Sequence, residues 1–248
     1  MKVPIRAAVM IVLVLASAPA AFAQTAEEII EKSIAAMGGR AAFDKVKTRS
    51  MAGTITLMTP AGDIPGSIEI LNARPNKTRT LIKADLSAFG AGPLTIDQRF
   101  DGQTGYVLDT LQGDREITGN QLDNMRNTGF PHAFLNYKEA GISVKLQGKE
   151  KVGNGEAYVL LFEPAKGSTI RQFIDAQTML PVRFSLTVNV PQVGADVEQT
   201  TSLEDYREVD GIKMPFKLNS SSSLQSFTVT LDKVAHNVEV DEKLFVKP

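Results

Sequence analysis

The chain of 248 residues is long enough for one large domain or two small ones, and its 43% of hydrophobic residues can fill a buried core. Its 27 basic residues are balanced by 28 acidic ones, so the chain lacks the positive excess that contacts nucleic-acid phosphates. It has no Cys, which excludes disulfides, thiolate nucleophiles and thiolate metal ligands, and it has only two His. A nucleic-acid partner is therefore not expected.

The first segment has the pattern of a secretory signal peptide. Lys2 and Arg6 give it a positive start, a nearly continuous apolar run follows, and Ala21-Phe-Ala23 has the small-x-small spacing of a cleavage site. An uncleaved signal anchor is the alternative, which the cleavage site disfavours. We therefore expect residues 1–23 to be removed, leaving residues 24–248 as a single periplasmic domain with no stable membrane span.

The mature N-terminus predicts a helix. Thr25 and Glu28 have the spacing of a capping box, and the paired glycines Gly38 and Gly39 are typical of a helix end. A second short helical segment is expected over residues 40–46. The apolar side chains that these two segments offer to a common core are Ile29, Ile30, Ile34, Met37, Phe43 and Val46.

From Arg49 onward the apolar residues alternate with polar ones, which is typical of antiparallel strands. We count roughly nine to eleven strands by this pattern, too many for a small sandwich and suited to one long, strongly curled sheet. Pro215 lies within one strand pattern and predicts an edge or a bulge there. Residues 85–93 predict a hairpin tip, with a mobile apolar loop at a cavity mouth as the alternative.

Two short helices are expected in the middle of the strand pattern. The first follows the capping-box spacing of Thr118 and Gln121 and ends at Gly129, and the second begins at Pro131 and ends at Gly141. Their apolar sides need a surface to cover, and the face of the sheet is the large apolar surface available. The helices then form a lid over an apolar cavity, or they plug the sheet and complete an ordinary core; spacing alone leaves both open.

A lidded apolar cavity suits acyl chains, because burying about ten methylene groups gives roughly 8 kcal/mol before ordering costs. The residues predicted to line the cavity are Ile55, Leu57, Ile68, Ile70, Leu94 and Ile96. The residues predicted to contact it from the lid are Leu122, Met125, Phe130 and Phe134.

Catalysis is not indicated by any motif. The chain lacks G-x-S-x-G, S-x-x-K, H-E-x-x-H and a glycine-rich nucleotide loop. His132 and His236 are each interpreted as a surface or capping histidine. The acids Asp101, Asp175 and Asp210 sit beside apparent turns, where a short carboxylate stabilises its own turn. We therefore expect no catalytic residue, no metal site and no cofactor.

Several segments, in order along the chain, resemble the LolA-like outer-membrane lipoprotein-sorting proteins. The resemblance begins in the N-terminal helix and continues to Thr54. The further segments that carry it are Phe100–Tyr106, Gly148–Val152, Phe173–Pro181 and Tyr206–Phe216. They are mostly strand and turn motifs, so they are more specific for the fold than for a cargo.

The resemblance implies a mainly β fold: an open antiparallel half-barrel with an N-terminal helix and lid helices over its concave face. It also implies a periplasmic carrier of lipids or lipoprotein acyl chains, with donor and acceptor proteins at the inner and outer membranes. Related half-barrels include sensing domains of stress-response regulators, so a regulatory domain that engages a protein partner is the alternative. The resemblance assigns the lid-locking arginine of the carriers to no single position here, because several arginines, including Arg49, Arg74 and Arg79, fall in the predicted early strands.

Overall fold

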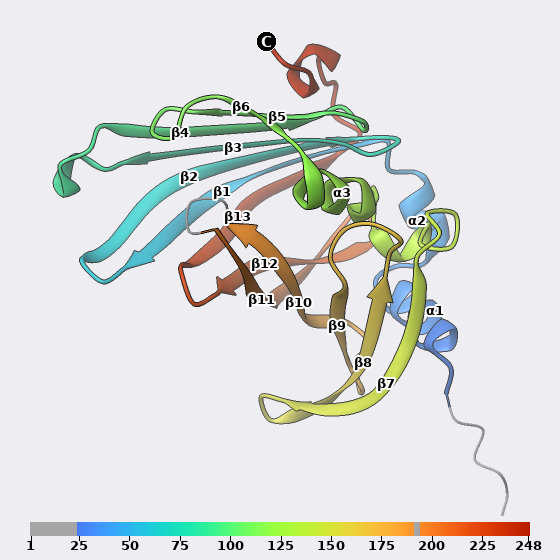
Figure 1. Cartoon of the computed structure of the whole chain (residues 1–248). Helices are drawn as coiled ribbons and strands as arrows, with labels where there is room; N and C mark the ends of the chain where they lie inside the picture. The colour runs from blue at the N-terminus through green and yellow to red at the C-terminus, as the bar shows by residue number, and fades with distance from the viewer. Residues whose placement is uncertain (1–23, 191–193) are drawn as a thin grey trace, which may run out of the picture.

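The computed structural model describes residues 24–190 and 194–248 and forms one sheet with a few helices (Figure 1). The predicted signal peptide, residues 1–23, lies outside the described residues. The helices are α1 (Ala26–Ala36), α2 (Arg40–Asp44) and α3 (Gly119–Thr128), with short 3₁₀ turns at η1 (Ser87–Phe89), η2 (Ala133–Leu135) and η3 (Glu242–Phe245). The strands are β1 (Thr48–Thr59), β2 (Gly62–Ala73), β3 (Lys77–Asp85), β4 (Pro93–Phe100), β5 (Gly105–Asp109), β6 (Arg115–Ile117), β7 (Ser143–Val152), β8 (Gly155–Glu163), β9 (Ile170–Asp175), β10 (Pro181–Val190), β11 (Ala195–Val209), β12 (Ile212–Ser221) and β13 (Ser226–His236).

All thirteen strands belong to one antiparallel sheet, in the order β6-β5-β4-β3-β2-β1-β13-β12-β11-β10-β9-β8-β7. Pairing between β1 and β13 joins the early and late parts of the chain near the middle of the sheet. Because β6 and β7 stand at opposite ends of this order, the sheet is open. The mainly β fold with one antiparallel sheet, an N-terminal helix and an inserted helix is thus confirmed.

The sheet is less curled than the sequence analysis predicted. Strands β1–β6 run across the upper part of the molecule, whereas β7–β9 run steeply below them (Figure 1). Neighbouring strands rotate by roughly 20–25° with a constant hand, so twist accumulates across many strands and turns the far end of the sheet. Twist, rather than a strong curl, accounts for the different directions of the two ends.

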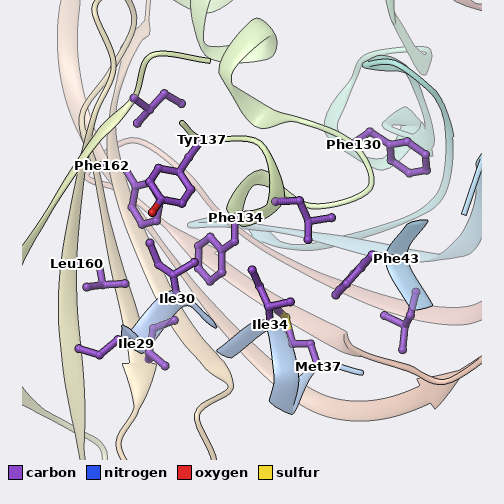
Figure 2. Close-up of a cluster of buried hydrophobic side chains, with 14 of the residues drawn as sticks. Ile29, Ile30, Ile34, Met37, Phe43, Phe130, Phe134, Tyr137, Leu160 and Phe162 are labelled. Atoms are coloured by element: carbon purple, nitrogen blue, oxygen red, sulfur yellow. The ribbon is translucent and has the colours of Figure 1, made fainter. Parts of the chain in front are cut away.

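The helix α1 anchors the main core. Thr25 caps it with the predicted capping box, in which the Glu28 side chain also accepts from the Thr25 backbone N–H. Its buried side packs with α2, the segment after α3, and β8 (Figure 2). The central members of this core are Ile29, Ile30, Ile34, Met37, Phe43, Val46, Phe130, Phe134, Tyr137, Leu160 and Phe162.

The helix α3 forms where it was predicted, but the second inserted helix does not. Only the 3₁₀ turn η2 is helical in that segment, and the backbone continues to Gly141 in separate turns. The reason is local: the Nδ1 atom of His132 accepts from the backbone N–H of Phe134, which closes a tight turn. Thr118 makes no side-chain capping bond, so the predicted capping box of α3 is also wrong.

Pro215 does not mark an edge strand, because β12 lies between β11 and β13. The ladder between β12 and β13 starts only at Lys217, so Pro215 precedes it. Pro215 pairs with Tyr206 of β11, next to Asp205, whose φ of 53° is left-handed. The predicted irregularity is therefore present without an edge.

Candidate functional site

One side of the central sheet is apolar and the other is polar. Strand register places Ile55, Ile68 and Val229 on the same side, because directly paired residues share a face. The remaining buried members of this cluster are Met214, Phe216 and Leu231, and the partly buried members are Met51, Leu57, Ile70, Ile82, Val209, Leu218, Phe227 and Val234. We call this set the apolar face. Alternate residues such as Thr54, Ser67 and Glu69 point the other way and are exposed.

The structure places four of the six predicted wall residues in this face and the other two in a cluster next to it. Ile55 and Ile68 are buried within it, and Leu57 and Ile70 are partly buried beside them. Leu94 and Ile96 lie in an adjoining cluster with Ile64, Ala84 and Leu86. Leu57 packs in both clusters, so they form one continuous apolar surface. Whether a ligand contacts these residues stays a prediction.

The helix α3 bridges two parts of the sheet, which we call the early arm (β1–β6) and the late arm (β7–β13). On the early arm, Asn76 donates from Nδ2 to the carbonyl oxygens of Met125 and Arg126, at 3.2 and 2.9 Å. The Met125 sulfur lies 3.9 Å from Nε2 of Gln98 in β4. The predicted lid residues Leu122 and Met125 are thus both partly buried on α3.

On the late arm, asparagines of α3 bind the loop between β8 and β9. Asn124 donates to Ser168 Oγ at 3.0 Å and accepts from the Ser168 backbone N–H at 2.6 Å. Asn120 also donates to Ser168 Oγ, and Asn127 donates to the carbonyl of Lys166 at 2.7 Å. Ser168 is buried and donates in turn to the carbonyl of Thr187 in β10. We call this set the asparagine clasp.

Phe130 and Phe134, the other predicted lid residues, lie in the main core. The ring of Phe134 stacks on Phe162 at 5.4 Å between centroids and meets His132 edge-on at 4.6 Å. Figure 2 shows Phe134 beside Ile30 and Ile34 of α1, with Phe130 set apart from them. The structure therefore does not place these two rings in the cluster that holds Ile55 and Ile70.

Arg49 in β1 is a buried cation under the segment that follows α3. Its guanidinium lies 5.3 Å from the Phe130 ring centre, and Nη1 donates to the carbonyl of Pro131 at a long 3.5 Å. Its Nε donates to Nε2 of His236 in β13 at 3.1 Å. Of the three arginines considered from the sequence, Arg74 donates to Val46 and Phe43, and Arg79 pairs with Asp97.

His236 is neither a surface nor a capping residue, so that interpretation was wrong. Its side chain is 1% exposed, and its Nδ1 lies 3.0 Å from Oδ2 of Asp210 in the β11–β12 turn. Since Nε2 accepts from Arg49, the neutral ring carries its proton on Nδ1 and donates it to Asp210. Arg49, His236 and Asp210 thus form a hydrogen-bonded chain from the core to the surface.

Burial sets the protonation of this cluster. It lowers the pKa of Arg49 to about 10, so the side chain remains a cation at neutral pH. It also lowers the pKa of His236, an effect that the charge of Arg49 reinforces and Asp210 opposes. Burial, and secondarily Arg49, lower the pKa of His132 to about 4. Both histidines are therefore neutral at pH 7.

Two pockets flank α3. One of about 280 Å³ is lined by Leu122, Ile117 and Phe245 with Arg99, Arg126 and Lys247 at its sides. Another of about 270 Å³ lies between the end of α3 and the segment around Tyr137. Both are just below the usual range of small-molecule sites, and the residues lining them do not include the six predicted wall residues.

The remaining sequence predictions concern acids and metals. Asp101 and Asp175 each accept from two backbone N–H groups and a threonine hydroxyl of their own turns, which confirms their turn role. Within residues 24–190 and 194–248, no group of three or more His, Asp or Glu is arranged to hold a metal ion. In the same residues no helix is long and apolar enough to cross a membrane.

Sequence reasoning missed the asparagine clasp and the Arg49 cluster. The clasp had a signal, because Asn120, Asn124 and Asn127 recur at helical spacing on one side of a predicted helix. The Arg49 cluster had no such sequence signal, because Arg49 and His236 are 187 positions apart and only the register of β1 with β13 brings them together.

Comparison with known proteins gives a match by structure only. No family model matches the sequence, and no curated protein matches it. A LolA superfamily protein from Nitrosomonas europaea superposes with a TM-score of 0.56 at 14% identity, covering 91% of this chain and 99% of that chain.

Two further structures match to a similar extent. A DUF1329 family protein from Desulfovibrio piger has a TM-score of 0.57 at 15% identity, covering 88% of this chain and 95% of that chain. A candidate outer membrane lipoprotein-sorting protein domain from Vibrio parahaemolyticus has a TM-score of 0.55 at 12% identity, covering 87% and 95%. The resemblance noted in the sequence is confirmed for the fold: over about nine tenths of its length, this chain folds like LolA superfamily proteins.

Proposed function

We propose that this protein carries acyl chains of lipids or lipoproteins through the periplasm and takes part in outer-membrane lipoprotein or lipid sorting. The apolar face is the observation that carries the proposal. Its outer members, such as Leu57, Ile70 and Phe227, remain partly exposed. A continuous apolar surface of this kind is unusual on a folded domain unless something binds it. The LolA-like fold supports the same function.

We infer that α3 moves when an acyl chain binds, because the two pockets that flank α3 are not lined by the predicted wall residues. The contacts that hold α3 are mainly hydrogen bonds between neutral groups, each worth roughly 1 kcal/mol net. A chain that buries about ten methylene groups gains roughly 8 kcal/mol, which exceeds the cost of releasing several such bonds. The wall of the opened site consists of Ile55, Leu57, Ile68, Ile70, Leu94 and Ile96, and Leu122 and Met125 close it from α3.

Arg49 is the candidate lock of the closed state. Of the three arginines considered from the sequence, it is the one that contacts the segment after α3, through Pro131 and the ring of Phe130. The bond to Pro131 is long, so it holds the segment without making release expensive. Phe130 and Phe134 then stay fixed in the main core while α3 moves.

The cellular part of the proposal depends on residues 1–23 acting as a cleaved signal peptide, with residues 24–248 as the exported domain. Exchange partners at the inner and outer membranes would deliver and accept the cargo. The role is one of binding rather than catalysis, with no cofactor or metal.

The test is native mass spectrometry, with organic extraction, of the mature chain purified from periplasm without detergent. A defined adduct with the mass of a lipid or acylated peptide is the expected result. If the chain is free of adducts and stays so after incubation with lipids and lipopeptides, the carrier function is wrong. A stoichiometric non-lipidated protein partner instead would favour the regulatory domain.

Two neighbouring residues of β2 give a matched pair of variants. Ile70 and Leu71 are both partly buried, but they lie on opposite sides of the sheet. Ile70→Gln should weaken acyl-chain binding about five-fold or more, whereas Leu71→Gln should leave it unchanged. Equal loss in both variants would point to general destabilisation instead of a binding face.

A further inference from the structure

Four hairpins that are neighbours in the sheet end on the same side of the molecule, as do the connected ends of β10 and β11 and of β8 and β9. Because each strand is antiparallel to its neighbours, the turns of β1–β2, β3–β4, β5–β6 and β12–β13 all lie at one end of the strands. In Figure 1 the tips of β1–β2, β3–β4 and β12–β13 project together at the left of the view. These four hairpins are consecutive in the order of the sheet.

Each of these tips exposes one large apolar side chain. Among the described residues, five such side chains are strongly exposed, and four of them are Met58 at 41%, Phe89 at 42%, Leu111 at 51% and Leu224 at 49%. Consecutive hairpins are two strands apart, so their tips repeat about every 10 Å at the usual strand spacing. We call this row of four tips the apolar rim.

The charges of the rim disfavour an anionic partner. The tip segments 58–63, 86–93, 110–114 and 222–225 contain Asp63 and Asp114 but no Lys or Arg. An anionic membrane, a nucleic acid or an acidic protein would find no complementary charge there. The four side chains are also separate projections, whereas a protein interface usually has a contiguous apolar centre. The interface of an uncharged bilayer accommodates such isolated projections.

The rim is connected to the apolar face. Leu86 follows β3 at the base of the Phe89 tip and packs with Ile64 and Leu94. Leu57, one residue before Met58, belongs both to that cluster and to the apolar face. The Phe89 tip is therefore joined to the apolar face through Leu86, Ile64 and Leu57, whereas Met58 points to the other side of β1.

From this geometry we infer that the apolar rim docks onto the surface of a bilayer of uncharged, zwitterionic lipids, as the edge through which cargo is exchanged. The exchange of cargo rests on the proposed function, whereas the docking does not. Phe89, Leu111 and Leu224 insert at the level of the headgroups, and Met58, which is paired with Asp63, stays at the water-facing edge with Asp63 and Asp114.

The first test is flotation of the full mature chain with vesicles of phosphatidylethanolamine and phosphatidylcholine. Substituting Phe89→Asn or Leu224→Asn should lower the partition coefficient about five-fold, and combining both changes should abolish flotation. Val246→Asn is the matched control, because Val246 is 42% exposed but lies near the C-terminus and outside the rim. Flotation should not change between low and high salt or on adding phosphatidylglycerol.

The second test uses the absence of Trp from the chain, which makes any introduced Trp a single fluorescent probe. Phe89→Trp and Leu224→Trp should shift their emission to shorter wavelength on adding vesicles, and Val246→Trp should not. Equal shifts in all three variants, or no flotation of the wild type, would overturn the docking. Loss of a dimer in the rim variants, seen by analytical ultracentrifugation, would show that a second copy covers the rim and would also overturn it.

The carrier function and the docking of the rim can be disproved independently of each other. The rim variants should still bind a soluble acyl ligand, such as a fluorescent fatty acid, when no vesicle is present. If the wild type floats but never binds an acyl ligand, docking stands and the carrier function fails. If it binds acyl ligands but never floats, the carrier function stands and the docking is wrong.

Discussion

At the scale of single residues, the buried cation Arg49 has no carboxylate in direct contact within the described residues. Its nearest polar partner is the neutral ring of His236, which is oriented by Asp210. Protonation of His236 would remove the lone pair that accepts from Arg49 and would place two positive charges side by side. The local structure around Arg49 therefore depends on keeping the histidines neutral.

Stability should decrease as the pH falls below about 6.5, because both histidines have a lower pKa in the folded chain than in the unfolded chain. The unfolded chain then binds protons first, which favours unfolding. For His132 the window runs from the ordinary histidine pKa of 6.5 down to its folded-state pKa of about 4. The loss over that window is on the order of 3 kcal/mol.

The variant His132→Asn isolates this contribution, since its amide oxygen can still accept from the backbone N–H of Phe134. Urea unfolding followed by circular dichroism at pH 7, 6 and 5 should show a smaller decrease in the variant than in the wild type. The difference between the two decreases should reach about 2 kcal/mol by pH 5. Carboxylates affect both proteins equally, so parallel pH profiles would contradict the assignment.

At the scale of elements, α3 is held by its polar side instead of by a buried apolar stripe. Among its described residues none is fully buried, while the asparagine clasp reaches across to the β8–β9 loop. Helices that rest on a few side-chain hydrogen bonds open locally at low cost. We therefore expect α3 to be the element that opens in the proposed function.

Asn124→Ala should therefore increase hydrogen exchange in α3 while leaving the strands protected. It removes both bonds to Ser168, for an expected local loss of about 1–3 kcal/mol. Asp123→Ala is the control, because Asp123 pairs only with Arg126 on the surface of the same helix. Equal exchange in the two variants, measured by mass spectrometry, would show that the clasp does not hold α3.

At Gly53 the central strand pair β1–β13 leaves no room for a side chain. A Cβ atom there would lie 2.0 Å from the carbonyl oxygen of Thr230, which is backbone and cannot swing away. Gly53→Ala should lower the free energy of unfolding by about 1–3 kcal/mol. Gly92→Ala, which meets no atom within 4 Å, should have little effect in the same urea titration.

Sequence patterns predicted the regular elements better than the irregular ones. The alternation in β1 and β2 and the capping box at Thr25 were sufficient to predict these elements, because local chemistry determines them. Strands rich in charge, such as β7, and the three-residue β6 lack that alternation, which is why thirteen strands form where roughly nine to eleven were predicted. The segment after Pro131 has helical spacing, but its rings fill a core contributed by α1 and β8, which local spacing cannot reveal.

The candidate site also combines features that the local sequence predicts with features that it cannot predict. The register of β1 with β2 follows from their short hairpin, so the common side of Ile55 and Ile70 was predictable. The contact of Arg49 with His236 depends on the pairing of the first strand with the last, and the clasp depends on where α3 crosses the sheet. These are properties of the assembled fold.

At the scale of the whole molecule, one open sheet presents an apolar side, a helix that bridges its two arms, and a row of apolar tips at one end. If α3 gates the apolar face, then fixing α3 to the late arm should stop the exchange of ligand without changing the face itself. The chain has no Cys, so two introduced cysteines can pair only with each other.

Asn124→Cys combined with Gly167→Cys tests this gate. A Cβ atom at Gly167 would lie 3.4 Å from the backbone nitrogen of Asn124, within the range where a disulfide can form after small adjustments. The φ of +95° at Gly167 adds strain of roughly 1–3 kcal/mol, which a stable sheet of this size tolerates. When oxidised, the variant should neither take up nor release a fluorescent fatty acid on the timescale of the wild type, and reduction should restore exchange. Each single-cysteine variant controls for the substitutions alone. Unchanged exchange in the oxidised form would mean that acyl chains reach the sheet by a route that does not involve α3, and the opening would then have to be sought at the apolar rim.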